Sequence, residues 1–132
     1  MRQQPPTPVS IVEAWQEAAN AQNAEQLLRL SAKDIEIAGP RGAGIGHTLL
    51  KEWLARAGLQ LATLRTFARG DVVVLEQRAV WHDLATGAVT GETMLASAFR
   101  VDDHGQVARV ARYDHLSVAL DAAGLTLADE VR

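Results

Sequence analysis

The stretch "LKEWLARAGLQLATLRTFA", residues 50–68, decides the fold, because the spacing of its apolar residues changes partway along. Leu50, Trp53 and Leu54 recur at the three- and four-residue spacing of one helix face. Gly58 follows, and glycine readily ends a helix in the left-handed conformation. Beyond it the apolar residues tend toward the alternation of a strand. The stretch therefore predicts a helix that ends near residue 58 and a strand over 61–68.

The rest of the chain extends this pattern in both directions. Upstream, Ser10 and Glu13 form a capping box for a helix over about 9–21, Asn23 caps a second helix, and residues 34–38 alternate as a short strand. Downstream, the pattern predicts further strands over about 71–83, 89–101 and 106–117, separated by Gly-containing turns. The expected fold class is α+β, with three N-terminal helices packed on the concave face of a curved, mainly antiparallel sheet.

Length and composition indicate one domain spanning residues 1–132, with 1–8 and 125–132 as flexible tails. The net charge of -3 argues against nucleic acid as a partner, because nucleic-acid binders carry basic patches. No run approaches the ~20 apolar residues of a membrane span. The first ten residues lack the apolar segment of a signal peptide. These observations predict a soluble, cytoplasmic protein without a membrane partner.

A glycine-rich segment, "IAGPRGAGIGHTLLKEW" over residues 37–53, resembles a phosphate-binding loop at first sight. His47 stands where a Walker A loop needs lysine and where a dinucleotide fingerprint needs glycine. The segment therefore predicts a strand-to-helix connection whose glycines permit unusual backbone angles. The four histidines are dispersed and no pair has metal-ligand spacing, so neither a metal nor a cofactor is expected.

Three segments carry a family resemblance: "LLRLSAKDIEIAGP" (27–40), "GHTLLKEWL" (46–54) and "FRVDDHGQVARVARYDHLSV" (99–118). In order and spacing the chain resembles the nuclear transport factor 2-like superfamily, which includes ketosteroid isomerases and SnoaL-type polyketide cyclases. The resemblance covers about residues 8–120. It implies a cone between sheet and helices that ligands enter, and a homodimer formed through the outer sheet face.

The resemblance also implies which positions carry the isomerase chemistry. Gly39 falls where the isomerases have their Asp base, Trp15 where they have the Tyr donor, and Ser97 where they have the protonated Asp. All three residues depart from the pattern. Since glycine cannot abstract a proton, the resemblance does not extend to ketosteroid isomerisation.

Strand alternation, placed by the resemblance, points Arg112 and Asp114 into the cone together. Charges removed from water are costly unless paired, so the two are expected to bond each other or a ligand. The catalytic hypothesis assigns Asp114 as general base or acid and Arg112 as the group that binds an anionic or enolate oxygen. The expected ligand-binding residues are Trp15, Gly39, Trp53, Leu75, Trp81, Leu95 and Ser97.

Two functions remain open from the sequence. One is a small-molecule enzyme of the cyclase, isomerase or dehydratase type that acts on a hydrophobic ligand by acid–base chemistry without a cofactor. The other is a non-catalytic ligand-binding or dimerisation module on the same fold. The outer sheet face is too apolar to remain exposed to water, which predicts that a homodimer covers it. Its apolar residues are Val72, Val74, Val80, Met94, Ala96 and Ala98. Glu76 and Arg78 on that face are expected to pair across the two-fold axis.

Overall fold

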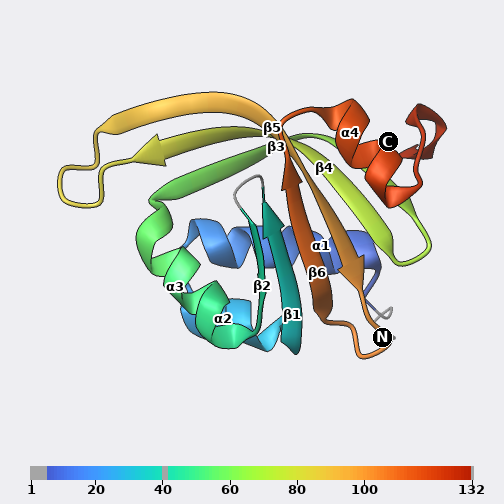
Figure 1. Cartoon of the computed structure of the whole chain (residues 1–132), viewed down its shortest axis with the longest axis horizontal. Coiled ribbons are helices and arrows are strands. Elements are labelled where there is room, and N and C mark those ends of the chain that lie inside the picture. The colour runs from blue at the N-terminus through green and yellow to red at the C-terminus, as the bar shows by residue number, and fades with distance from the viewer. Residues whose placement is uncertain (1–5, 40–41, 132) are drawn as a thin grey trace, which may run out of the picture.

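A computed structural model describes residues 6–39 and 42–131, except for the side chains of residues 56 and 57. Three helices, α1 (Pro8–Asn20), α2 (Ala24–Arg29) and α3 (His47–Ala57), lie on one side of a curved sheet (Figure 1). A further helix, α4 (Leu116–Ala123), lies on the other side. We call the side that carries α1 to α3 the concave face and the side that carries α4 the convex face. The α+β prediction is confirmed.

Within the described residues, seven strands form one sheet in the order β2-β1-β6-β5-β4-β3-β7. Their bounds are β1 (Ser31–Gly39), β2 (Gly42–Ile45), β3 (Leu59–Arg69), β4 (Val72–His82), β5 (Val89–Val101), β6 (Val107–Tyr113) and β7 (Glu130–Val131). Neighbouring strands run antiparallel except β1 and β6, which are parallel. The N-terminal strand thus joins the sheet beside the last long strand rather than beside β3.

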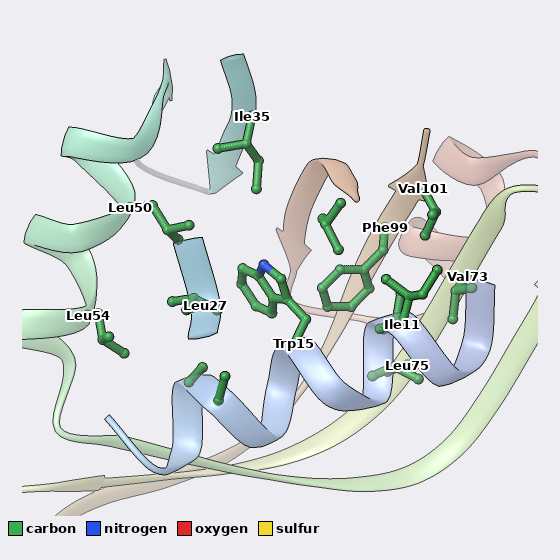
Figure 2. Packing of buried hydrophobic residues seen from close by; sticks show 14 residues of the cluster. Ile11, Trp15, Leu27, Ile35, Leu50, Leu54, Val73, Leu75, Phe99 and Val101 are labelled. Carbon is green, nitrogen blue, oxygen red and sulfur yellow. The ribbon is translucent and has the colours of Figure 1, made fainter. Parts of the chain in front are cut away.

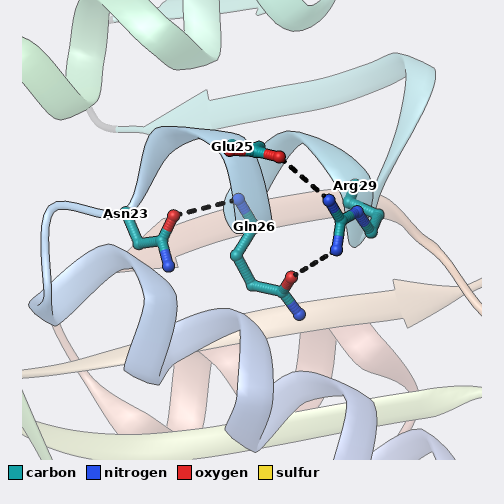
Figure 3. Close-up of polar contacts among 4 residues, drawn as sticks. All are labelled: Asn23, Glu25, Gln26 and Arg29. Carbon is teal, nitrogen blue, oxygen red and sulfur yellow. Dashed lines mark hydrogen bonds and ion pairs between the residues drawn. The ribbon is translucent and has the colours of Figure 1, made fainter.

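Helix starts follow capping chemistry, although not always at the expected residue. The capping box predicted at Ser10 and Glu13 is wrong, because Thr7 caps α1 and Pro8 occupies its first position. The Thr7 hydroxyl accepts from the Ser10 N–H at 3.1 Å, and the Ser10 hydroxyl accepts from the Thr7 N–H at 2.9 Å. Asn23 caps α2 as predicted, by accepting from the Gln26 N–H at 3.2 Å (Figure 3).

The glycine-rich segment connects a strand to a helix, as predicted, but part of it also forms β2. Gly42–Ile45 pairs with the end of β1, so the connection is a hairpin rather than a simple turn. Gly46, at φ +105°, then caps α3 in a conformation that side-chain residues avoid. Helix α3 ends at the predicted Gly58, in the left-handed region at φ +50°. Pro40 and Arg41, within the same segment, lie outside the described residues.

The core on the concave face forms where α1 crosses the sheet. Val73 and Leu75 of β4 and Phe99 of β5 pack there with Trp15 of α1 (Figure 2). Val74, the residue between the two β4 positions, instead packs on the convex face against α4. The predicted register of β4 and β5 is therefore confirmed, with odd-numbered residues toward α1.

The convex face differs from the sequence prediction, because α4 covers part of it. Val74 and Ala96 are fully buried and Ala98 is nearly so, in a cluster with Leu120 and Leu125. The expectation that a second copy buries Val74 and Ala96 is wrong for these two residues. Residues 125–131, expected as a flexible tail, pack back onto the sheet: Leu125 is 5% exposed and β7 pairs with β3.

Candidate functional site

A chain of polar side chains, of which Ser97, Gln77 and Gln16 are buried and Thr63 is exposed, crosses the concave face between α1 and three strands. Ser97 Oγ of β5 donates to Gln77 Oε1 of β4 at 2.7 Å, and Gln77 Nε2 donates to Gln16 Oε1 of α1 at 2.5 Å. Gln16 Nε2 then donates to Thr63 Oγ1 of β3 at 2.9 Å. Each hydrogen bond compensates the loss of water around a buried polar group.

Sequence reasoning placed Ser97 in the site but missed Gln16 and Thr63. One signal was available: Gln16 follows Trp15 on the buried side of an otherwise apolar helix stripe. A buried glutamine on a helix requires a polar partner from the element facing it.

Arg112 extends this polar row toward β6. It is the register partner of Ser97 across the β5–β6 ladder, so both side chains lie on the concave face. Arg112 is half-buried, and the loss of water around its guanidinium lowers its pKa below the ordinary arginine value. The ion pairs and hydrogen bonds between described residues give its side chain no protein partner. Among the residues that the structure describes, the site therefore presents a partly desolvated cation without a partner.

Asp114 does not supply the missing partner. Strand β6 ends at Tyr113, and Asp114 follows it as an exposed residue. Among the ion pairs of the described residues, none joins Asp114 to Arg112. The sequence left two possibilities for Arg112, a bond to Asp114 or a bond to a ligand, and the first is not formed.

Gly39 lies at the same end of the sheet as Arg112. The last paired positions of the parallel β1–β6 ladder are Ala38 and Ala111, so the next residues, Gly39 and Arg112, lie side by side. A Cβ atom added at Gly39 would meet no heavy atom within 4 Å. Among the described residues, Gly39 therefore leaves room beside its own backbone next to Arg112.

The other expected ligand-binding residues are packed against one another. The Trp15 ring stacks on Trp53 with centroids 6.3 Å apart and meets Phe99 edge-on at 5.5 Å. Leu75 is fully buried in this core, whereas Leu95 packs in a neighbouring cluster that also contacts Trp53 and Trp81. These side chains form apolar clusters beside the polar row, and Arg112 lies at the β6 end of that row, next to Gly39.

Two candidate donors are already engaged within the protein. Trp15 Nε1 donates to Ser31 Oγ at 2.9 Å, and the Ser97 hydroxyl proton points to Gln77. His47 Nε2 lies 2.9 Å from the Ser31 carbonyl oxygen, which fixes the imidazole beside β1.

Within residues 6–39 and 42–131, no group of three or more His, Asp or Glu side chains is arranged to hold a metal ion. The helices of these residues include none with the length and apolar character of a membrane span.

A curved sheet that encloses helices on its concave face defines the cone-shaped α+β class. No protein-family model and no curated protein matches the sequence. Solved structures identify the fold as that of the nuclear transport factor 2-like proteins, which confirms the resemblance seen in the sequence at the level of fold.

Three of these structures illustrate the likeness. An NTF2-like protein of unknown function from Cytophaga hutchinsonii has a TM-score of 0.72 at 15% identity, covering 89% of this chain and 97% of its own. A Mycobacterium tuberculosis protein in complex with estradiol-17β-hemisuccinate has a TM-score of 0.72 at 18% identity, covering 86% and 97%. A candidate polyketide cyclase from Sinorhizobium meliloti has a TM-score of 0.66 at 17% identity, covering 77% and 92%.

Proposed function

We propose that the concave face binds a flat, hydrophobic small molecule whose anionic or carbonyl oxygen is held by Arg112. The observation that carries this proposal is the half-buried guanidinium, for which the described residues provide no ion-pair or hydrogen-bond partner. A desolvated charge destabilises the free protein, and an anionic ligand oxygen restores a charge-assisted hydrogen bond. Trp53, which is partly exposed and stacks on the buried Trp15 ring, supplies apolar surface for the ligand body.

The Mycobacterium tuberculosis neighbour supports this ligand class. Its bound molecule joins a flat, apolar ring system to a succinate carboxylate. The same combination suits a site in which apolar side chains lie near a cation and the adjacent residue, Gly39, carries no side chain. We extend the ligand class to this chain on that ground, and no cofactor is needed for binding.

Acid–base catalysis is a second candidate function, and the position of Asp114 favours it. Asp114 follows Arg112 by two residues and is exposed, so its carboxylate can exchange protons with water. In such a reaction Asp114 takes a proton from the carbon beside a ligand carbonyl, and Arg112 stabilises the resulting enolate until the proton returns. This chemistry corresponds to the cyclase, isomerase or dehydratase class. Ketosteroid isomerisation is not proposed, since Gly39 offers no base and Trp15 already donates to Ser31.

The binding proposal is tested by titrating estradiol-17β-hemisuccinate into the protein, with tryptophan fluorescence as the readout. Arg112→Gln is expected to weaken binding by about 2 kcal/mol, roughly thirtyfold, because a charged hydrogen bond is lost. Arg78→Gln, on the convex face, serves as the matched control and is expected to leave the affinity unchanged. Estradiol, which lacks the carboxylate, should bind the unmodified protein and the Arg112→Gln variant equally.

Two results would contradict the proposal. One is a hemisuccinate affinity that Arg112→Gln leaves unchanged; the other is a loss of binding in Arg78→Gln alone. Asp114→Asn then separates the two candidate functions. If the protein is an enzyme, the Asp114→Asn variant retains ligand binding and loses proton exchange at the ligand carbon.

We also propose a homodimer through the part of the convex face that α4 leaves open. Met94 is 49% exposed there, and Val80 is half-buried beside it. The sequence predicted that Arg78 pairs with Glu76 of a second copy. In the structure Arg78 instead pairs with Glu92 of its own chain, with 2.5 Å between Nε and Oε1, so this proposal does not rely on the Glu76 pair. The cytoplasmic location stays a prediction from the sequence.

A further inference from the structure

A groove lies on the convex face, between the end of α4 and the strands beneath it. Its volume is about 160 Å³, and Ala98, Ala122 and Ala123 contribute apolar surface to it. Arg100, Arg109 and Tyr113 also line the groove and supply its polar groups. None of these residues belongs to the site proposed on the concave face.

The two arginines are an unusual pair, because they lie directly opposite each other. Arg100 and Arg109 are register partners across the β5–β6 ladder and so share the convex face. Like charges in this arrangement repel and destabilise the sheet. Arg109 is compensated, since its Nε donates to Glu36 Oε2 at 2.7 Å, and Glu36 raises its pKa above the ordinary value.

Arg100 has no such compensation. It is exposed, and neither the ion pairs nor the hydrogen bonds of the described residues include its side chain. Val72, its register partner on the other side, is apolar. The groove therefore combines an apolar floor with one guanidinium, Arg100, that is unmatched among the described residues and a second, Arg109, whose five N–H groups outnumber its partners Glu36 and Tyr113.

We infer that this groove binds a small organic carboxylate, with the carboxylate between Arg100 and Arg109 and its apolar body over the alanines. A carboxylate in that position relieves the repulsion between the guanidinium groups and matches their planar donors. A cavity of roughly 150 Å³ accommodates a benzene ring, so a benzoate-sized anion fits the volume. Tyr113, which also lines the groove, adds a hydroxyl group that can donate to the bound carboxylate.

This groove is independent of the cone. Arg100 and Ala98 point away from the face that carries Ser97 and Arg112, because successive strand residues alternate. Failure of the function proposed above would therefore leave this inference intact, and the variants of each site separate the two.

The test is an NMR titration of the full chain with sodium benzoate, at constant ionic strength maintained with sodium chloride. We expect shifts at the backbone amides of Ala98, Ala122 and Ala123. Benzyl alcohol, which keeps the ring and lacks the charge, should bind at least about tenfold more weakly. Arg100→Gln is expected to weaken benzoate binding by about tenfold, whereas Arg29→Gln, an exposed arginine on α2 (Figure 3), should leave it unchanged.

A second variant tests the apolar part of the groove. Ala122→Leu fills the recess while both arginines remain, and it should abolish benzoate binding. The inference is overturned if benzyl alcohol binds as tightly as benzoate, or if either Arg100→Gln or Ala122→Leu binds benzoate like the unmodified protein. It is equally overturned if the shifts lie around Arg112 and disappear in Arg112→Gln.

Discussion

At the scale of single residues, Gln77 does more than fill space in the core. Its side-chain amide is fully buried, accepts from Ser97 and donates to Gln16, so it links β4 to both β5 and α1. Apolar packing alone is non-directional, whereas these hydrogen bonds fix how α1 lies over the sheet. The position of Arg112 beside Ser97 is set by the register of β5 and β6.

Replacing Gln77 with leucine should lower the free energy of unfolding by about 1–3 kcal/mol, because the buried partners Gln16 and Ser97 lose their hydrogen bonds. Urea denaturation measures the change. Thr90→Val, at an exposed position on β5, is the control and should alter stability by less than about 0.5 kcal/mol. Equal stability of Gln77→Leu and the unmodified protein would contradict a structural role for the row.

At the scale of elements, α4 determines how much of the convex face meets water. Its buried residues Ala119 and Leu120 pack with Phe67 of β3 and Val74 of β4. Leu125 and β7 extend this contact past the end of the helix. The C-terminal segment is thus packed as part of the folded domain.

Leu120→Ala should destabilise the protein by about 2–5 kcal/mol, since it leaves a cavity between α4 and the sheet. Val118→Ala provides the matched control on the same helix, because Val118 is 48% exposed. Thermal and urea unfolding report both changes. A small effect at Leu120, comparable to that at Val118, would show that α4 does not dock as described.

The β4–β5 turn carries a pH dependence of its own. Asp83 Oδ1 accepts from the Ala85 N–H at 2.8 Å and the Thr86 N–H at 2.9 Å, and the bonds from Thr86 and then Ala85 lower the pKa of this carboxyl. A lowered folded-state pKa stabilises the turn above the unfolded-state value, near 3.9, and this contribution is lost as pH falls through the folded-state pKa.

The amides of Ala85 and Thr86 are therefore expected to lose hydrogen-exchange protection as pH falls through the lowered folded-state pKa of Asp83, which lies below the ordinary carboxyl value of about 4. Asp83→Asn should show little pH dependence at these two amides over the same range. Protection that follows the same pH profile in both proteins would argue against control by the Asp83 carboxylate.

At the scale of the whole molecule, the exposed end of the convex face leads to a prediction about assembly. The protein should be a dimer by light scattering at micromolar concentration, and Met94→Glu should make it a monomer by placing charge in an apolar contact. Val118→Glu, on exposed α4 surface, should leave the dimer intact. A monomeric unmodified protein would rule out the proposed interface.

Much of this architecture is predictable from the sequence, because long amphipathic elements carry their own period. Alternation assigned Val73 and Leu75 to one face and Val74 to the other, and Gly58 marked the end of α3. Strand β2 was missed, since "GAGI" has too few side chains to show alternation and is specified by pairing with β1. The docking of α4 was also missed, because it depends on residues distant in the sequence.

The candidate site was predictable only in part. Alternation correctly placed Ser97 on the concave face, and Arg112 follows from its register with Ser97. The relation of Arg112 to Asp114 was not predictable, because it depends on the strand ending at Tyr113 rather than continuing. Gln16 and Thr63 meet across 47 residues of sequence, a distance over which local pattern carries no signal.

The parallel pairing of β1 with β6 has a consequence for synthesis on the ribosome. β6 lies between β1 and β5, so the nascent chain cannot join its first two strands to the others until residue 113 has left the exit tunnel. Until then, the β3–β5 meander can form while its apolar surfaces lack their full cover. Such partly assembled sheets fold slowly and expose unpaired edges, which chaperones that hold nascent chains recognise.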